Sequence, residues 1–498
     1  MTASGPAAVA ETHAAVLFFV GDRAYKLKKP VDLGFLDFRD RADREAVCHR
    51  EVALNRRLAP DVYLGVADVR GPGGVICDHL VVMRRMPAQR RLSTLIRSGQ
   101  DVRAELRRLA RVLAAFHATA RRGPEVSAEG TRDALLGRWD ATFAQLRPFH
   151  GGVLDADAAA EVERRTHDFL AGREPLFAGR IAGGHVVDGH ADLIADDIFC
   201  LPDGPRILDC LEFDDKLRYV DVLDDVAFLA MDVEHLGAAA EARAFLDTYA
   251  EFSGDPAPAA LLHHYVAYRA FVRAKVGCVR HEQGDPAAAA DVTAYTELTL
   301  SHLRAGAVRL ILTGGTPGTG KTTLAGALAD RLGAVLISSD PLRKELAGLP
   351  PQTRAAAAYE QGIYSPAWTE KVYATMLRRT ESLLAMGESV VLDASWNRDA
   401  HRAAARLLAG TARAGLTELR CTAAPATVSA RLARRTPGAS DADAAIAAAL
   451  AADGDAWPEA CPIRTDGPEP ALDAAIGAIR GGGGRLCPPA RAVGLWGR

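Results

Sequence analysis

Alternating apolar and polar positions form the first regular pattern in the chain, in the segment AAVLFFVGDRAYKLKKP at residues 14–30. Alternation of this kind indicates β-strands with one buried face, and the triplet Gly-Asp-Arg at residues 21–23 is typical of a tight turn. The run LVVMRRM at residues 80–86 predicts a further strand, which ends before Pro87. We therefore expect a β-sheet at the N-terminal end that includes a hairpin.

Apolar positions at helical spacing dominate the next part of the chain. The segment CHREVALNRRLAP at residues 48–60 mixes such positions with charges and ends at a proline, which predicts an amphipathic helix that includes Glu51. Further helices are predicted at residues 103–120, within residues 134–171 and at residues 268–280, and a last helix follows a segment with Gly284 and Pro286 and runs to about residue 305. Strands come first and helices follow, with the change near Pro87.

A buried strand, a glycine loop and a helix follow one another from residue 308, as VRLIL, GTPGTGKT and TLAGALADRL. This is the order of a phosphate-binding loop, in which backbone N–H groups surround phosphate oxygens, a lysine reaches the β- and γ-phosphates, and a hydroxyl holds Mg²⁺. A glycine turn that merely joins a strand to a helix gives no reason for Gly-Lys-Thr at the helix start. The predicted ATP-binding residues are Gly315, Thr316, Pro317, Gly318, Thr319, Gly320, Lys321, Thr322 and Thr323, and Thr322 is also a predicted magnesium ligand.

Further apolar runs predict strands of the same parallel sheet, at residues 334–338, 388–396 and 417–421. Asp340 follows the first of them, at the sheet edge where ligands bind, and is a candidate base for an acceptor hydroxyl. A helix N-cap before Pro341 is the compatible alternative for this residue. Asp393, in the second run, fits a Walker-B carboxylate that contacts Mg²⁺ directly or through water.

The segment RLARRTPGASDADA at residues 431–444 predicts a lid over this site. Arg431 and Arg435 would stabilise the charge of the transferred phosphoryl group and exclude water when the lid closes. A solvated helix face is the alternative interpretation of these arginines.

Composition narrows the class of protein. A chain of 498 residues is long enough for two or three domains, and a net charge of −3 gives no general attraction to nucleic acid or anionic membranes. The 8 cysteines include no C-x-x-C pair, which argues against a zinc ribbon or a disulfide framework. The N-terminal segment lacks a basic leader, and acidic Glu11 interrupts its apolar run, so we expect a cytoplasmic protein with no membrane span.

Carboxylates cluster in the stretch DGHADLIADDIFCLPDGPRILDCLEFDD at residues 188–215. Its apolar segments flank Pro-Asp-Gly and predict a hairpin that brings Asp192, Asp197 and Asp209 together. Carboxylates that lack matching cations repel one another unless a metal ion or a proton balances them, and Mg²⁺ is the natural choice. The alternative is an acidic surface loop with ordinary turn aspartates.

The segment HADLIADDI resembles the catalytic loop of the aminoglycoside phosphotransferase and choline kinase-like families, and ILDCLEF resembles their metal-binding strand. The resemblance implies a bilobal protein-kinase-like α+β fold. It makes His190 the histidine of the loop, Asp192 the catalytic aspartate, and Asp197 and Asp209 the magnesium ligands. Asp225 resembles the aspartate that supports the catalytic loop from a later helix.

The same resemblance implies that Lys26 is the lysine that contacts ATP and that Glu51 is its partner on the following helix, although Lys28 and Lys29 compete for this role. The chain departs from the family pattern at Asp197, where asparagine is usual, and at the alanine before Asp192. A glycine-rich loop of the protein-kinase pattern is also missing. These departures concern catalysis more than fold.

The second half resembles the P-loop small-molecule kinases grouped with zeta-toxin-like and gluconate or shikimate kinase-like proteins, which implies a P-loop NTPase domain with a parallel α/β sheet. The predicted organisation is a kinase-like domain at residues 1–303, with lobes of residues 1–87 and 88–303, a P-loop domain at residues 308–480, and a flexible tail at residues 481–498.

Together the halves resemble bifunctional aminoglycoside phosphotransferase-like/ATP-binding proteins, often described as AAA family ATPases. The first hypothesis is a phosphotransferase with two ATP and Mg²⁺ sites that acts on a hydroxyl of a small polar molecule, such as a sugar or an aminoglycoside. The alternative is a regulatory or stress protein in which only the P-loop domain hydrolyses or senses ATP. A third hypothesis, phosphorylation of nucleic-acid ends, lacks the basic, aromatic-interleaved stripe that such binding requires.

Overall fold

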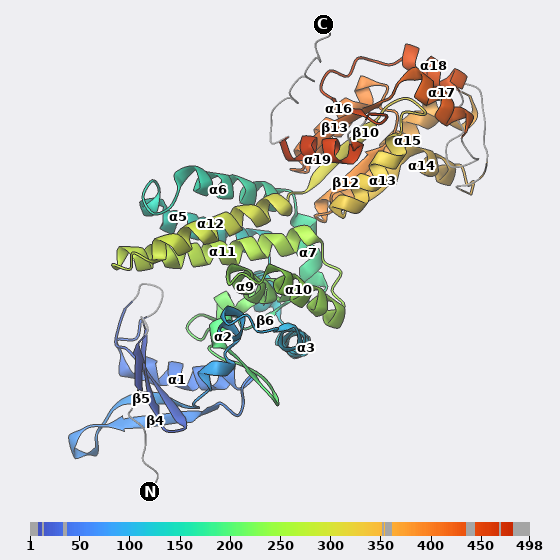
Figure 1. Ribbon diagram of the computed structural model, residues 1–498. Helices are drawn as coiled ribbons and strands as arrows, with labels where there is room; N and C mark the ends of the chain where they lie inside the picture. Colours follow the sequence, from blue (N-terminus) through green and yellow to red (C-terminus); the bar gives the residue numbers. More distant parts are fainter. Residues whose placement is uncertain are drawn as a thin grey trace. The chain divides into compact units, whose positions relative to one another are not determined.

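The computed structural model describes residues 8–11, 14–32, 37–350, 353, 361–434, 444–467 and 470–481. The chain divides into two compact units (Figure 1). The N-terminal unit consists of Met1–Thr166, Phe177–Ala257 and Leu261–Gly306, and the C-terminal unit consists of His167–Leu176, Pro258–Ala260 and Ala307–Arg498.

The N-terminal unit begins with an antiparallel five-stranded sheet in the order β1-β2-β3-β5-β4. Its strands are β1 (Ala8–Glu11), β2 (Ala15–Val20), β3 (Arg23–Lys28), β4 (Tyr63–Arg70) and β5 (Ile76–Arg84). The hairpin predicted at residues 14–30 is confirmed, since Val20 pairs with Arg23 across the turn. Cys48 and Val52 of α1 (Arg41–Asn55) pack against Val81 and Met83 of the sheet. This sheet and α1 form the small lobe.

Helix α1 begins earlier than the predicted start at residue 48, because the Asp40 side chain accepts a hydrogen bond from Ala42 N at 2.8 Å and caps it. The helix also ends at Asn55, before the proline that was expected to stop it. Glu51 lies in the last turns of the helix and is completely buried. The shifted boundaries therefore leave Glu51 on the helix, facing the sheet.

The large lobe is mainly helical. Its helices are α2 (Leu92–Arg97), α3 (Arg103–Thr119), α4 (Pro124–Ala128), α5 (Arg132–Leu146), α6 (Ala156–Ala171), α7 (Glu174–Ala182), α8 (Asp215–Arg218), α9 (Val222–His235), α10 (Ala239–Ser253), α11 (Ala259–Glu282) and α12 (Ala288–Ala305). Two short antiparallel pairs carry the acidic stretch: β6 (Val186–Asp188) with β9 (Tyr219–Asp221), and β7 (Ile198–Leu201) with β8 (Gly204–Ile207). The hairpin predicted from Pro-Asp-Gly is the β7–β8 pair.

The C-terminal unit contains a parallel five-stranded sheet in the order β11-β12-β10-β13-β14. The strands are β10 (Arg309–Gly314), β11 (Val335–Ser338), β12 (Val390–Asp393), β13 (Gly415–Thr422) and β14 (Cys461–Arg464). The helices are α13 (Lys321–Leu332), α14 (Ser339–Leu346), α15 (Pro366–Ala385), α16 (Asp399–Thr411), α17 (Pro425–Ala433), α18 (Ala444–Ala452) and α19 (Ala471–Gly481). Ile311, Val391 and Leu419 pack against Leu324 and Leu328 of α13, so the glycine loop leaves the centre of a buried sheet.

These architectures are the predicted ones: a two-lobed α+β unit of protein-kinase type and a parallel α/β unit of P-loop type. The predicted tail lies outside the described residues, apart from Gly481, which ends α19. Within the described ranges, no helix is both long enough and apolar enough to cross a bilayer.

Candidate functional site

Lys26 of β3 lies between two carboxylates in the N-terminal unit. Its Nζ is 2.9 Å from Glu51 Oε1 on α1 and 2.5 Å from Asp209 Oδ1. Burial disfavours the charged ammonium, but the charges of Asp209 and Glu51 outweigh it and raise the pKa of Lys26 well above its ordinary value. The structure thus joins the predicted ATP lysine, its helix partner and one predicted magnesium ligand.

The two competing lysines have other partners. Lys28 Nζ lies 2.6 Å from Glu51 Oε2 and also contacts Glu212, whereas Lys29 Nζ lies 2.5 Å from Glu11 Oε1. Lys26 and Lys28 are two residues apart on one strand and therefore share a face, which directs both toward Glu51. Lys26 also contacts Asp209, so of the three lysines it is the one that joins the predicted helix partner to a predicted magnesium ligand, and its role as the ATP lysine stays a prediction.

Asp225 of α9 holds the predicted catalytic loop through hydrogen bonds to the loop backbone. Its Oδ2 accepts a hydrogen bond from His190 N and its Oδ1 accepts one from Ala191 N, both at 2.7 Å. Ala191 has a φ of 67°, a left-handed conformation that is strained for alanine. A Cβ on Gly189 would lie 2.6 Å from Asp225 Oδ2, so the carboxylate can reach the loop only past a glycine. Asp225 therefore supports the loop as the family resemblance implies.

The three predicted acids influence one another electrostatically. Burial, reinforced by the charge of Asp209, raises the pKa of Asp192 to about 7. Burial and the charges of Asp209 and Asp192 raise the pKa of Asp197 well above its ordinary value. Burial would also raise the pKa of Asp209, but the adjacent Lys26 ammonium outweighs it and lowers that pKa. The cluster thus carries more negative charge than its surroundings balance, which fits a divalent cation.

The described residues contain no group of three His, Cys, Asp or Glu side chains already arranged around one metal position. In this arrangement the Lys26 ammonium takes one oxygen of Asp209. The magnesium-binding roles of Asp197 and Asp209 therefore stay predictions. Both residues offer oxygen ligands of the type that Mg²⁺ prefers.

The glycine loop of the C-terminal unit has backbone conformations that require glycine. Gly315, Gly318 and Gly320 have φ values of 137°, 84° and 83°. A Cβ on Gly315 would lie 2.8 Å from the carbonyl oxygen of Cys421, and one on Gly318 would lie 2.9 Å from Val428 Cγ1. The loop leads directly into α13, whose first residue is Lys321, so the helix N-terminus faces the same place as the loop.

Asp393 lies at the C-terminal end of β12, opposite Thr313 of β10 and Ser338 of β11. Burial raises its pKa, although the charge of Lys321 and a hydrogen bond from the Thr322 side chain act in the opposite direction. Its Oδ1 is buried and has no hydrogen-bond partner among the described residues. An orphaned buried carboxylate oxygen beside Lys321 and Thr322 is a fitting ligand for Mg²⁺ or for a water bound to it.

The alternative for Asp340, that it caps a helix, is wrong. Helix α14 begins at Ser339, its N-cap is Ser338, and no side chain makes a capping hydrogen bond there. Asp340 instead lies in the first helical turn, and its charge contributes to the raised pKa of Asp393. It therefore lies at the edge of the sheet near the predicted metal ligand, where the role of acceptor base stays a prediction.

Arg431 of α17 lies against the glycine loop. It donates to Thr465 Oγ1 at 3.0 Å, to Thr465 O at 2.9 Å and to Gly318 O at 3.4 Å. It thus contacts protein carbonyls, and its predicted contact with a phosphoryl group is untested. Arg435, the other predicted lid arginine, lies outside the described residues.

Arg343 and Arg402 are buried arginines of this unit that are absent from the predicted site residues. Arg343 follows Asp340 by three residues on α14, donates to Ile363 O at 2.7 Å and lies over the ring of Tyr364 at 4.9 Å. Arg402 donates to the carbonyl of Trp396 at 2.8 Å and supports its left-handed φ of 56°. The spacing of Asp340 and Arg343 placed both on one helix face and was the available signal for the first of them.

The geometry defines a P-loop kinase-like unit joined to a unit of protein-kinase type. A family model described as an AAA domain matches residues 310–453. The uncharacterized protein Rv2004c of Mycobacterium tuberculosis (strain ATCC 25618 / H37Rv) is 46% identical over 460 residues, which cover 92% of each chain. The chain belongs to the same protein family as this mycobacterial protein.

Solved structures resemble each part. A choline/ethanolamine kinase family protein from Mesorhizobium loti is 16% identical, with a TM-score of 0.39, over 60% of this chain and 88% of its own. A gluconokinase from Sinorhizobium meliloti 1021 is 17% identical, with a TM-score of 0.25, over 34% of this chain and 91% of its own.

Proposed function

We propose that the protein is a phosphotransferase with two ATP sites, each of which transfers the γ-phosphoryl group to a hydroxyl of a small polar molecule. The observation that carries the proposal is that each unit has a lysine close to acidic side chains: Lys26 contacts Glu51 and Asp209, and Lys321 lies near Asp393. Mg²⁺, when bound by these acids, neutralises charge on the transferred group.

In the N-terminal unit, Lys26 would hold the α- and β-phosphates while Glu51 fixes the position of its ammonium. Asp192 would orient the acceptor hydroxyl and accept its proton. A pKa of about 7 suits this work, because a base with a pKa near neutrality is ionised in part and still accepts a proton well. The Asp225 contacts would keep the backbone of the loop in place during transfer.

In the C-terminal unit, the loop amides and Lys321 would bind the β- and γ-phosphates, and Thr322 and Asp393 would hold the metal ion. Asp340 would receive the acceptor proton. Lys321 and the N-terminus of α13 act on the same phosphates, because the lysine is the first residue of that helix.

A screen with labelled ATP tests the proposal. Sugars, aminoglycosides and nucleosides are offered to the wild-type chain, to Lys321→Ala and to Asp192→Ala, with Lys371→Ala, a substitution at an exposed lysine, as a control. We expect each site variant to lose transfer to one acceptor class by more than about a hundredfold while the control keeps both. Full turnover by both site variants on every acceptor would show that the assignment is wrong.

A second candidate function is regulatory, with ATP binding but no transfer in the N-terminal unit. The observation that favours it is the contact of Lys26 with Asp209, which occupies a predicted magnesium ligand, together with the extra charge at Asp197. Calorimetry of the Lys321→Ala chain with ATP, with and without Mg²⁺, separates the two. Metal-dependent binding followed by labelled product excludes the regulatory alternative, and binding without product supports it.

A further inference from the structure

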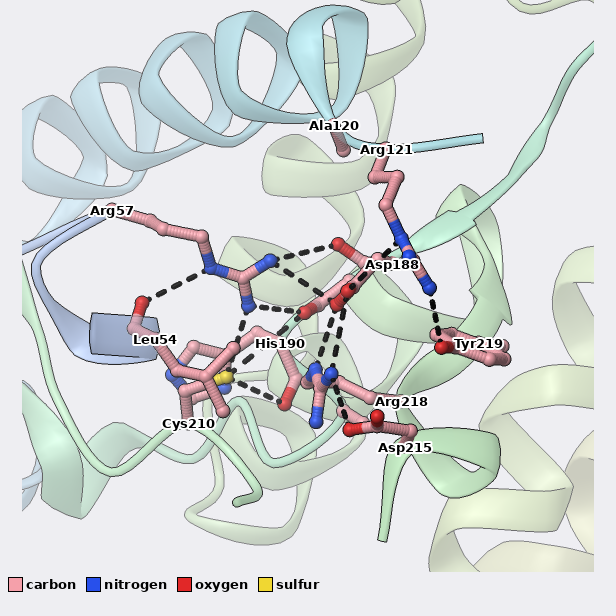
Figure 2. A network of polar contacts seen from close by, with 12 residues as sticks. Leu54, Arg57, Ala120, Arg121, Asp188, His190, Cys210, Asp215, Arg218 and Tyr219 are labelled. Carbon is pink, nitrogen blue, oxygen red and sulfur yellow. Dashed lines mark hydrogen bonds and ion pairs between the residues drawn. The ribbon is translucent and has the colours of Figure 1, made fainter. Parts of the chain in front are cut away.

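Asp188 is the centre of a polar network at the entrance to the catalytic loop (Figure 2). Its Oδ1 accepts hydrogen bonds from Arg218 Nε at 2.7 Å and from Arg57 Nη1 at 3.2 Å, and its Oδ2 accepts one from Arg218 Nη2 at 3.3 Å. Arg121 Nε lies 4.0 Å from the same carboxylate. Asp188 is only 8% exposed, so these arginines replace water around its charge. We call these four residues the Asp188 anchor.

Arg57 is the part of the anchor that comes from the small lobe. It lies just after α1, and each of its side-chain nitrogens donates a hydrogen bond: Nε to Leu54 O at 3.0 Å, Nη1 to Asp188 O at 3.1 Å, and Nη2 to Gly189 O at 2.8 Å and to Cys210 Sγ at 3.1 Å. Its guanidinium also lies over the ring of Phe116 at 5.0 Å. Lysine could not replace this planar, forked set of donors.

These contacts reach both segments that carry the predicted catalytic acids. Gly189 directly precedes His190 and the catalytic loop, and Cys210 directly follows Asp209. Arg218 adds a hydrogen bond to Leu211 O at 3.1 Å, so the segment after Asp209 is held from a second direction. Figure 2 shows the guanidinium groups of Arg57 and Arg218 both directed toward Asp188.

The C-terminal end of α1 is fixed to the same segment by another residue. Asn55 Oδ1 accepts a hydrogen bond from Cys210 N at 2.9 Å, and Asn55 Nδ2 donates to Glu51 O at 2.9 Å. Asn55 and Arg57, at the end of the helix that presents Glu51 to Lys26, therefore both form hydrogen bonds with the large lobe. A rigid connection of this kind sets the distance between the lysine pair and the catalytic loop.

We propose that Arg57 and Asp188 are positioning residues, which lock α1 to the catalytic loop and to the segment after Asp209 and so keep the N-terminal site assembled without a separate activating step. The inference rests on the proposed function of the N-terminal unit. Arg57 and Asp188 contact other protein groups and act through Glu51, Asp192 and Asp209. Because transfer needs near-ideal alignment, a displacement of about 1 Å costs about a hundredfold in rate.

Arg57→Lys and Asp188→Asn test the anchor in the full chain, with Lys321→Ala as the parent so that only N-terminal turnover is measured. Arg50→Lys is the matched control, because Arg50 also comes from α1 and reaches the large lobe, but through an exposed contact with Asp215. We expect Arg57→Lys and Asp188→Asn to lower kcat for Mg²⁺-dependent ATP turnover by about ten- to a hundredfold, with KM for ATP changed by less than about twofold. The control should match the parent.

Hydrogen exchange gives a readout that does not depend on turnover. The amides of Gly189, His190, Ala191 and Leu211 are hydrogen-bonded within the segments that the anchor holds. They should exchange about tenfold faster in Arg57→Lys than in Arg50→Lys. Equal exchange in these two variants overturns the inference, and so does faster exchange with an unchanged kcat, which would make the anchor merely structural.

An inactive parent that still binds ATP would refute the proposed function and the catalytic part of this inference together. Faster exchange in the two anchor variants would then still establish the lock between α1 and the catalytic loop. If either variant fails to fold, its melting temperature shows this, and the other variant decides.

Discussion

The two units position their site lysines by different kinds of interaction. Lys26 is enclosed by carboxylates from α1 and from the segment after β8, which are far apart in the sequence. Lys321 belongs to a run of consecutive residues and starts a helix whose preceding glycines adopt conformations closed to other residues. The first site depends on tertiary packing and buried charge, whereas the second depends on local backbone geometry. Substitutions should therefore damage them through different physical terms.

Removal of a charge at Glu51 should give the largest loss of stability. Glu51 is completely buried and lies between Lys26 Nζ at 2.9 Å and Lys28 Nζ at 2.6 Å, so Glu51→Gln leaves two buried ammonium groups with less compensation. We expect the unfolding free energy of the small lobe to fall by about 3–5 kcal/mol. Denaturant-dependent hydrogen exchange of peptides from α1 and β5 measures this.

The control for Glu51→Gln is Asp43→Asn on the same helix, since Asp43 is exposed in the first turn of α1. It should change stability by no more than about 0.5 kcal/mol. An equal loss of unfolding free energy in the two variants would mean that the buried ion pairs of Glu51 stabilise the small lobe no more than an exposed charge does.

The second prediction concerns the backbone geometry of the glycine loop in the C-terminal unit. In Gly318→Ala the new Cβ would sit 2.9 Å from Val428 Cγ1 at a φ of 84°, so we expect a loss of about 2 kcal/mol and a strong loss of ATP affinity. Thermal unfolding with and without ATP measures both effects.

Gly326→Ala on α13 is the matched control, because nothing lies within 4 Å of a Cβ added there. It should stabilise the helix by about 0.5–1 kcal/mol. A destabilised control would shift the explanation from loop geometry to the packing of α13.

The same contrast explains which site residues could be predicted from the sequence. The phosphate loop was predictable residue by residue, because its chemistry lies in consecutive positions that α13 and β10 then flank. The pattern alone gives only weak support for an ion pair between a strand lysine and Glu51, and the family resemblance was needed to choose Lys26, since nothing local specifies which lysine meets which acid. The contact of Lys28 with Glu51 and Glu212 needed the fold, although the two-residue spacing from Lys26 already put both on one face.

The short edge strands β1 and β14 were among the elements that the sequence did not predict, and so was the longer strand β4. β1 has a fully exposed pattern, and β14 is a strand of only 4 residues, so neither carries the run of buried positions that reveals a strand. The Asp340 cap was wrong because α14 begins at Ser339, two residues before the proline that was expected to start it. The Asp188 anchor was also missed, since its arginines come from three separate segments and only the fold brings them together.

The third prediction concerns Asp393, a buried acid whose nearby lysine, Lys321, does not offset the effect of burial on its pKa. Burial raises the pKa of Asp393, which means that its ionised form is costly in the folded protein. Such a group destabilises the fold at neutral pH, so Asp393→Asn should raise the unfolding free energy by about 1 kcal/mol in the absence of metal. It should also lower Mg²⁺-dependent ATP affinity by about tenfold.

Asp330→Asn on the exposed face of α13 is the control and should alter neither quantity. Calorimetry with ATP and Mg²⁺, next to thermal unfolding without them, separates the two effects. Glu51 is expected to stabilise its unit and Asp393 to destabilise its own. If Asp393→Asn destabilised the free protein, this difference between the two units would be refuted.

The smallest effect should come from Ala191→Gly, which places a glycine at a positive φ in the N-terminal site, as in the glycine loop of the C-terminal unit. Ala191 holds a φ of 67° against its own preference, supported by the Asp225 hydrogen bond to its N–H and by Arg269 Nη1, which donates to its carbonyl at 3.2 Å. Ala191→Gly relieves the strain of a left-handed alanine but makes the unfolded chain more flexible, so a net gain of about 0.5–1 kcal/mol is expected. Arg413→Gly, at a φ of 50° outside the site, should give a similar gain.

Because Asp225 fixes the loop through backbone N–H groups that glycine retains, Ala191→Gly should leave turnover by the N-terminal unit within about twofold. A gain in stability with a large loss of turnover would mean that the alanine itself restrains the loop, and the N-terminal site would then depend on local geometry as much as the P-loop does.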